Sequence, residues 1–165
     1  MDFFYPNFIN DHWRIEGEVF HGDAQHFVNQ ANKTFKLREI VEHLKEHGIG
    51  FFDTAIAVKR LEDNASDKFL EVVAPTDIHA MIAQLPTLKA IVTTGEKATE
   101  TIVASLGLHD HRGQVSLPKV NAFIPTAIRD LELYRLPSSS RAYPMSLSKK
   151  AEAYRKMFER YSLLS

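Results

Sequence analysis

The chain has 165 residues, of which 44% are hydrophobic and 25% charged, and its formal charge is −1; it therefore fits one globular domain with no overall attraction to nucleic acid. Cysteine is absent, which excludes disulfides, thiolate zinc sites, cysteine-ligated iron–sulfur clusters and cysteine nucleophiles. The chain has no run of about 18 apolar residues and its first residues lack a signal-peptide pattern, so we expect no membrane contact and a cytoplasmic location.

Helical patterns and turn signals dominate the first part of the chain. Residues 1–13 are rich in aromatic and amide side chains and predict a loop that leads into a short helix near 11–19. Thr34 is typical of a helix N-cap, followed by apolar residues at helical spacing, and Gly48 is typical of a terminator. The continuous apolar run at 49–52 is typical of a buried strand in a parallel sheet.

The rest of the chain alternates helix and strand after a mixed stretch at 55–64. The predicted elements are, in chain order, a helix capped by Thr76 and stopped by Pro86, a strand at 90–94, a helix at 96–106, strands at 120–124 and 131–136, and a helix from Ser146 or Ser148. This alternation predicts an α/β layer fold, in a single domain, with a short, mainly parallel sheet.

A loop rich in hydroxyl groups follows the strand predicted at 131–136. Pro137 ends that strand because proline has no N–H for a sheet ladder, and the next residues are Ser138, Ser139, Ser140 and Arg141. Ligands of open α/β sheets bind at the carboxyl ends of strands, and serine hydroxyls and arginine suit phosphate oxygens. The loop predicts contact with a phosphate backbone, although a surface turn followed by a helix cap explains the same residues.

Positive charge is concentrated near the end of the chain. Residues 135–160 hold seven basic residues against two acidic ones, Glu152 and Glu159. A local field of this kind is enough for phosphate contact, and a solvated helix face is the alternative. His109 and His111 form a tight histidine pair, but structural metal sites need more ligands than these two, so we expect no metal.

Five short motifs occur together along the chain. They are Tyr-Pro-Asn-Phe-Ile-Asn-Asp-His-Trp at 5–13, Gly-Ile-Gly-Phe-Phe-Asp-Thr-Ala at 48–55, Asn-Ala-Ser-Asp at 64–67, Thr-Thr-Gly-Glu-Lys-Ala at 93–98 and Leu-Pro-Ser-Ser-Ser-Arg-Ala at 136–142. In this order they resemble a branch of the uracil-DNA glycosylase superfamily, close to the hypoxanthine-DNA glycosylases and the mismatch-specific uracil or thymine glycosylases. The resemblance covers nearly the whole chain. It implies a monomeric three-layer α/β/α sandwich that flips a damaged or mismatched base out of DNA and hydrolyses its N-glycosidic bond without metal or cofactor.

The resemblance also implies roles for individual residues. Asn10 matches the asparagine of the family's Asn-x-x-Trp element and would position the attacking water or the base. Phe52 would lie beside the flipped base, and Asp53 would help to order the site. Thr94 and Gly95 fall at the strand-to-helix turn of the base pocket. The second signature loop, which grips phosphates and wedges into the duplex, matches Pro137, Ser138, Ser139, Ser140 and Arg141.

The chain departs from the family pattern in two ways. The loop lacks a histidine, which implies weaker stabilisation of the departing base and slow activity on uracil. The family's first strand and Gly-Ser-x-Pro loop would precede residue 5, so we expect a chain truncated at its N-terminus, with unpaired groups in the middle of the sheet. Two hypotheses stay open, an active DNA glycosylase and a glycosylase-like protein that binds nucleic acid or a nucleobase without cleaving. A serine hydrolase using Ser139 or Ser140 is disfavoured because the Gly-x-Ser-x-Gly elbow is absent.

Overall fold

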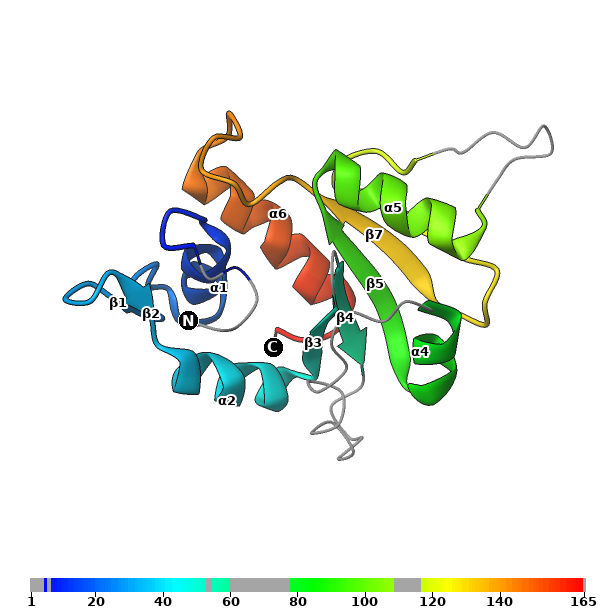
Figure 1. Ribbon diagram of the computed structural model, residues 1–165, viewed down its shortest axis with the longest axis horizontal. Helices are drawn as coiled ribbons and strands as arrows, with labels where there is room; N and C mark the ends of the chain where they lie inside the picture. The colour runs from blue at the N-terminus through cyan, green and yellow to red at the C-terminus, as the bar shows by residue number, and fades with distance from the viewer. Residues whose placement is uncertain (1–4, 6, 53–54, 60–77, 109–116, 165) are drawn as a thin grey trace. The chain divides into compact units, whose positions relative to one another are not determined.

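The computed structural model describes the chain except for residues 1–4, 6, 53–54, 60–77, 109–116 and 165 (Figure 1). Its contacts divide it into two compact units: unit 1 is Met1–His43 with Ser138–Ser165, and unit 2 is Leu44–Pro137. Across the described residues, no helix combines the length and apolar character needed to cross a membrane. Four predicted features lie outside the described residues, namely the helix cap Thr76, the motif at 64–67, the histidine pair His109 and His111, and the site residue Asp53.

Unit 1 contains two helices that pack against each other, α1 (His12–His21) and α6 (Leu147–Arg160). These confirm the helices predicted near 11–19 and after Ser146. The Ser146 hydroxyl caps α6 by accepting the Lys149 N–H at 3.2 Å. The apolar residues that the two helices bury are Trp13, Ile15, Val19, Ala151, Ala153, Tyr154, Met157 and Phe158.

A short hairpin follows α1 in unit 1. β1 (Val28–Asn29) pairs antiparallel with β2 (Thr34–Phe35), and α2 (Leu37–His47) begins after it. The prediction that Thr34 caps a helix is therefore wrong, because Thr34 is paired in β2. Strand pairing and the burial of Phe35 outweigh the local preference of threonine for a helix N-cap.

Unit 2 contains a five-stranded sheet in the order β3-β4-β5-β7-β6. Its strands are β3 (Ile49–Phe52), β4 (Ala55–Lys59), β5 (Leu88–Thr94), β6 (Phe123–Pro125) and β7 (Glu132–Leu136). Together with the helices, these strands confirm the α/β class. Among the described strands of this sheet only β5 and β7 pair in parallel, and the other three pairings are antiparallel, so the prediction of a mainly parallel sheet is wrong.

The reason for the antiparallel pairing lies in β4, which the mixed sequence at 55–64 did not predict as a strand. Phe52 at the end of β3 lies opposite Ala55 at the start of β4, so two consecutive strands pair side by side without a crossover helix. β4 also pairs with β5 on its other edge. The gap expected from a missing central strand is therefore not found among the described strands.

The core of unit 2 lies between its helices and the sheet. α4 (Ile78–Gln84) and α5 (Glu96–Leu106) contact each other, and α5 contacts β5 (Figure 1). The apolar stripes predicted for these helices are buried. Most residues of β5 and β7 are buried as well. The buried cluster consists of Ile78, Met81, Ile82, Leu85, Leu88, Ile91, Ile102, Val103, Leu106, Leu131 and Leu133.

Candidate functional site

Unit 1 brings the start of α1 and the serine-rich loop into contact. The Asp11 N–H donates a hydrogen bond of 3.0 Å to the Ser139 carbonyl. Next to it, the Asn10 Oδ1 accepts the His12 N–H at 2.8 Å, so this amide shapes the first turn of α1. The start of α1 and the serine-rich loop, to both of which the resemblance assigns site residues, are therefore joined by a direct hydrogen bond.

The Asp11 carboxylate lies among three cationic side chains. Its Oδ2 is 3.3 Å from Lys150 Nζ and its Oδ1 is 3.4 Å from Arg141 Nε. Burial and the nearby Arg141 lower the pKa of the Arg14 guanidinium, while Asp11 raises it. Arg14 is held in place by its donation to the Phe8 and Asn10 carbonyls, at 2.7 and 3.1 Å. Three cations against one carboxylate leave a local excess of positive charge.

The serine hydroxyls of the loop have different environments. The Ser138 Oγ accepts the Ser140 N–H at 3.1 Å, and the Ser140 Oγ accepts the Ala142 N–H at 3.3 Å. These bonds are turn-forming and lie at the surface. Ser139 is buried and forms a side-chain hydrogen bond with Tyr154. Of the three serines, Ser138 and Ser140 thus fit the surface-turn alternative, and Ser139 anchors the loop to α6.

A buried chain of polar groups lies beneath this loop, and the sequence did not predict it. The Tyr154 hydroxyl is 3.2 Å from His12 Nδ1, His12 Nε2 contacts one oxygen of Glu16, and His43 Nε2 is 3.0 Å from the other. His12 and Glu16 are fully buried. The carboxylate can only accept, so each facing imidazole nitrogen carries the proton of its hydrogen bond.

This chain of contacts shifts two pKa values. Burial alone would raise the pKa of Glu16, but the charges and hydrogen bonds of His12 and His43 outweigh burial and lower it to about 2. Burial, with the nearby Tyr5 and Glu16, raises the pKa of Tyr154 well above its ordinary value, and the bond with Ser139 opposes this. At neutral pH Glu16 is therefore a buried anion and Tyr154 a neutral hydrogen-bonding group.

In unit 2, the predicted base-pocket turn has a defined hydrogen-bond pattern. Gly95 has φ 93° and ψ 165°, a conformation that only glycine adopts readily, and its N–H donates to the Leu136 carbonyl at 3.0 Å. Two buried hydroxyls support the turn: Thr93 and Thr99 lie 2.8 Å apart, and Thr99 donates to the Gly95 carbonyl at 2.7 Å. Thr94 and Gly95 themselves are half-buried.

We expect Thr99→Val to destabilise the protein by about 1–2 kcal/mol, because the buried Thr93 hydroxyl would lose its close partner and keep only a long contact of 3.5 Å with the Tyr134 carbonyl. Thr101→Val is a matched control, since its exposed hydroxyl donates to the carbonyl four residues earlier in the same helix. Its effect should stay within about 0.5 kcal/mol. Urea unfolding measures both values; equal losses in the two variants would contradict a special role of the buried pair.

The other predicted site residues are described only in part. Phe52 is the last residue of β3, and Asp53 lies outside the described residues. Pro137 is buried and follows β7 directly. In the described part of the chain, no three His, Asp or Glu side chains are arranged to hold a metal ion.

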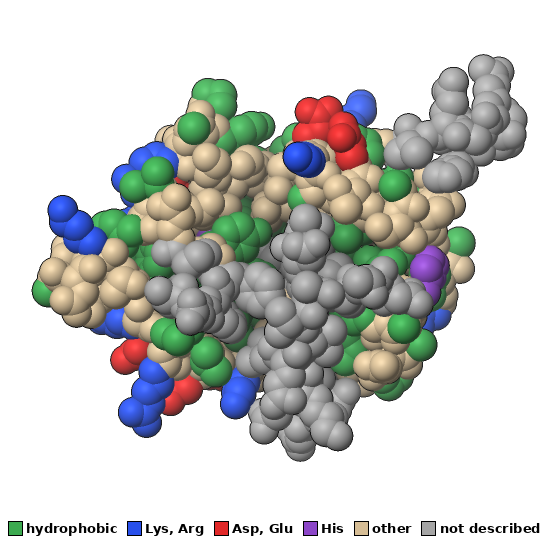
Figure 2. All heavy atoms as spheres, in the orientation of Figure 1, with side chains coloured by type: hydrophobic (Ala, Val, Ile, Leu, Met, Phe, Trp, Pro, Cys, Tyr) green, Lys and Arg blue, Asp and Glu red, His purple; other side chains and the backbone are tan. Residues whose placement is uncertain are grey.

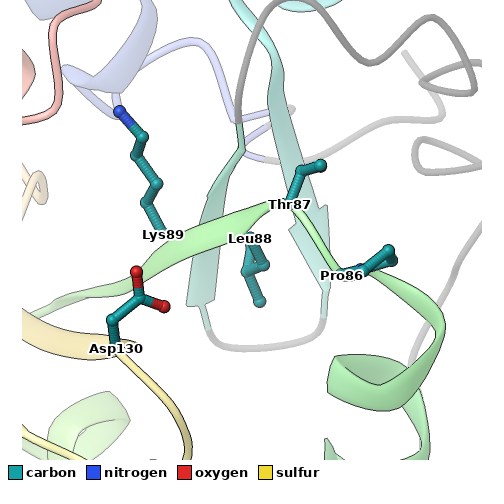
Figure 3. Close-up of a pocket in the computed structure, with 5 residues that line it drawn as sticks. All are labelled: Pro86, Thr87, Leu88, Lys89 and Asp130. Atoms are coloured by element: carbon teal, nitrogen blue, oxygen red, sulfur yellow. The ribbon is translucent and has the colours of Figure 1, made fainter.

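A small pocket lies at the opposite end of β5 from Gly95. It has a volume of about 160 Å³ and is lined by Pro86, Thr87, Leu88, Lys89 and Asp130 (Figure 3). Its polar side chains are one hydroxyl, one cation and one carboxylate, those of Thr87, Lys89 and Asp130. On the face shown in Figure 2, Lys and Arg side chains lie in separate groups rather than in one basic patch.

Comparison of the chain with protein-family models, with curated proteins and with solved structures gave no significant match. The likeness of the five motifs to DNA glycosylases therefore stays a prediction.

Proposed function

We propose that this protein is a DNA glycosylase of base-excision repair, which flips a damaged base such as uracil or hypoxanthine, or a mismatched base, out of DNA and hydrolyses its N-glycosidic bond. The observation that carries the proposal is the junction between the start of α1 and the serine-rich loop. The Asp11 N–H donates a hydrogen bond to the Ser139 carbonyl. The Asp11 carboxylate accepts from Arg141, which lies 130 positions later in the chain. The proposal includes the three-layer α/β/α sandwich and action as a monomer.

Each candidate residue has a role that its chemistry allows. In the reaction the bond from the sugar C1′ to the base nitrogen breaks, the oxygen of a water bonds to C1′, and the proton released by that water goes to the departing base. Asn10 accepts the His12 N–H, and its amide N–H groups suit a base carbonyl or the water. Phe52 would stack on the base, Thr94 and Gly95 would line the base pocket, and Asp53 would order the site.

The loop would hold the DNA backbone during this step. Ser138 and Ser140 bring hydroxyls and turn N–H groups, and Arg141 brings a charge that is half exposed. Extruding a base bends the phosphate backbone, so a loop fixed to two helices is well suited to hold it. The absence of a loop histidine fits a slow reaction on uracil.

The second candidate is a glycosylase-like protein that binds a nucleic acid or a nucleobase without cleaving it. One observation favours this second candidate. Asn10 is used just before the helix, where its Oδ1 accepts the His12 N–H and its carbonyl accepts from Arg14. An asparagine needed only for the fold would explain the same contacts.

The two candidates separate in a cleavage assay. We expect the protein to release uracil, hypoxanthine or a mismatched base from oligonucleotides, seen as strand breaks after alkali, and Asn10→Ala to slow this release about 10²-fold because a positioned donor is lost. Asn7→Ala is the matched control, since the exposed Asn7 also accepts a backbone N–H two residues on, at 3.1 Å. It should change the rate only a few-fold.

Gel-mobility shifts without strand breaks would support the binding protein instead, provided that salt and Arg141→Ala both weaken the shift. If neither breaks nor shifts occur with any of these oligonucleotides, both candidates are wrong.

A further inference from the structure

Asp11 is shared by two cations with opposite environments. The Lys150 side chain is 1% exposed, and its Nζ lies 3.3 Å from Asp11 Oδ2 and 2.8 Å from the Ser140 carbonyl. The Arg141 side chain is 52% exposed, and its Nε makes a long contact of 3.4 Å with Asp11 Oδ1. One carboxylate thus has an enclosed partner and an accessible one.

The two ion pairs differ in how easily they can be exchanged. Separating the buried Lys150 ammonium from the Asp11 carboxylate would leave a buried charge without its partner, so the Lys150 pair is strongly favoured over separation. An ion pair with an exposed arginine contributes little net free energy, so another anion can readily take the place of the carboxylate beside Arg141. Because Lys150 already neutralises Asp11, Arg141 loses little when it turns to a different partner.

We propose that Lys150 is a positioning residue that neutralises Asp11 and thereby keeps Arg141 available for a phosphodiester group of DNA. Without the Lys150 charge, Arg141 would be the remaining side chain in a direct ion pair with Asp11, beside the nearby charge of Arg14, and Arg141 would be held more tightly against the protein. The bond from Lys150 to the Ser140 carbonyl adds a second effect, because it fixes the loop that carries Arg141. The choice of DNA as the ligand rests on the proposed function. The first step, the effect of Lys150 on the freedom of Arg141, is a property of the protein without DNA.

The free protein tests that first step. We expect ¹⁵N relaxation of the Arg141 Nε–H to show a more rigid side chain in Lys150→Met than in the wild type, and a return to wild-type mobility in the double variant Asp11→Asn with Lys150→Met. Lys149→Met is the matched control, because it removes an exposed positive charge one residue away and should leave Arg141 unchanged. Lys150→Gln, whose amide can still donate to Ser140, replaces Lys150→Met if the latter does not fold. An Arg141 side chain of unchanged mobility would overturn the inference.

The second step is tested by the salt dependence of DNA binding. The slope of log K against log salt should fall by about 1 in Lys150→Met, as in Arg141→Ala, because one phosphate contact is lost in each. The double variant of Asp11 and Lys150 should recover the wild-type slope, which a merely destabilised fold would not do. If the wild type binds DNA and Lys150→Met has the same slope of log K against log salt, the inference is overturned. A wild type that does not bind DNA overturns the proposed function, and the relaxation result still decides the role of Lys150.

Discussion

Glu16→Gln is expected to lower the free energy of unfolding by about 3 kcal/mol at neutral pH. The fall of the Glu16 pKa from 4.5 to about 2 corresponds to a stabilisation of about this size. The charge is buried and accepts from His12 and His43, so neutralising it removes the partner of two imidazoles at once. Urea unfolding followed by the fluorescence of Trp13, the single tryptophan of the chain, measures the loss.

The depressed pKa of Glu16 sets the pH range over which this residue stabilises the fold. The pKa of Glu16 is lower in the folded protein than in the unfolded chain, so its stabilisation is complete above about pH 4.5 and is lost as the pH falls towards 2. The difference between the wild type and Glu16→Gln should therefore shrink over that range. Glu42→Gln is the control, because Glu42 pairs with Arg38 at the surface and should contribute less than about 1 kcal/mol. A difference that stays constant between pH 6 and pH 2.5 would contradict a depressed pKa of Glu16.

The helices could largely be predicted because each buries one stripe of apolar side chains. The predicted ranges near 11–19 and at 96–106 agree with α1 and α5, and Gly48, with φ 66°, ends α2 as predicted. Thr34 shows the limit of local rules. Its N-cap preference is real, but Thr34 pairs with Asn29 of β1, and no local pattern links these two residues.

Strand direction could not be predicted from the sequence. An apolar run such as that of β3 fits any strand buried on both faces, and parallel or antiparallel pairing is decided by which segment arrives beside it. Here β4 follows at once and pairs antiparallel along its length. The strands at 90–94 and 131–136 were easier, because Gly95 and Pro137 mark their ends, and these two form the parallel pair.

The roles of the candidate site residues stay predictions. The contact between Asp11 and Ser139 joins the start of α1 to the serine-rich loop, two of the segments to which the resemblance assigned site residues. The buried cluster of Glu16 was missed, although a signal was present: His12 and Glu16 are four residues apart on the helix face that also buries Ile15. A polar pair on a buried face needs further partners, and nothing in the sequence links them to His43, which lies 27 positions later.

Trp13→Ala is expected to cost about 3–5 kcal/mol, because it removes a fully buried indole from unit 1. The ring lies edge-on to three neighbours, with centroid distances of 4.6 Å to His12, 6.4 Å to Phe27 and 6.5 Å to Tyr5. Circular dichroism during urea unfolding gives the value, since the variant has no tryptophan. Ile9→Ala, at an exposed side chain nearby, should stay within about 0.5 kcal/mol; a similar loss in both variants would show that the indole is not part of the core.

Variants of Trp13 also test whether Asn10, in the Asn-x-x-Trp element, has a structural or a catalytic role. Trp13→Phe keeps an aromatic ring in the core and should lose only about 1–2 kcal/mol, because less volume is removed than with alanine. If Asn10 works only through the start of α1, then Trp13→Phe and Asn10→Ala should reduce base release in proportion to their loss of stability. If Asn10 acts on the base or the water, Trp13→Phe should retain most of the rate while Asn10→Ala loses about 10²-fold at equal folded fraction. The ratio of the two rates, measured below the unfolding transition of both variants, decides between these readings.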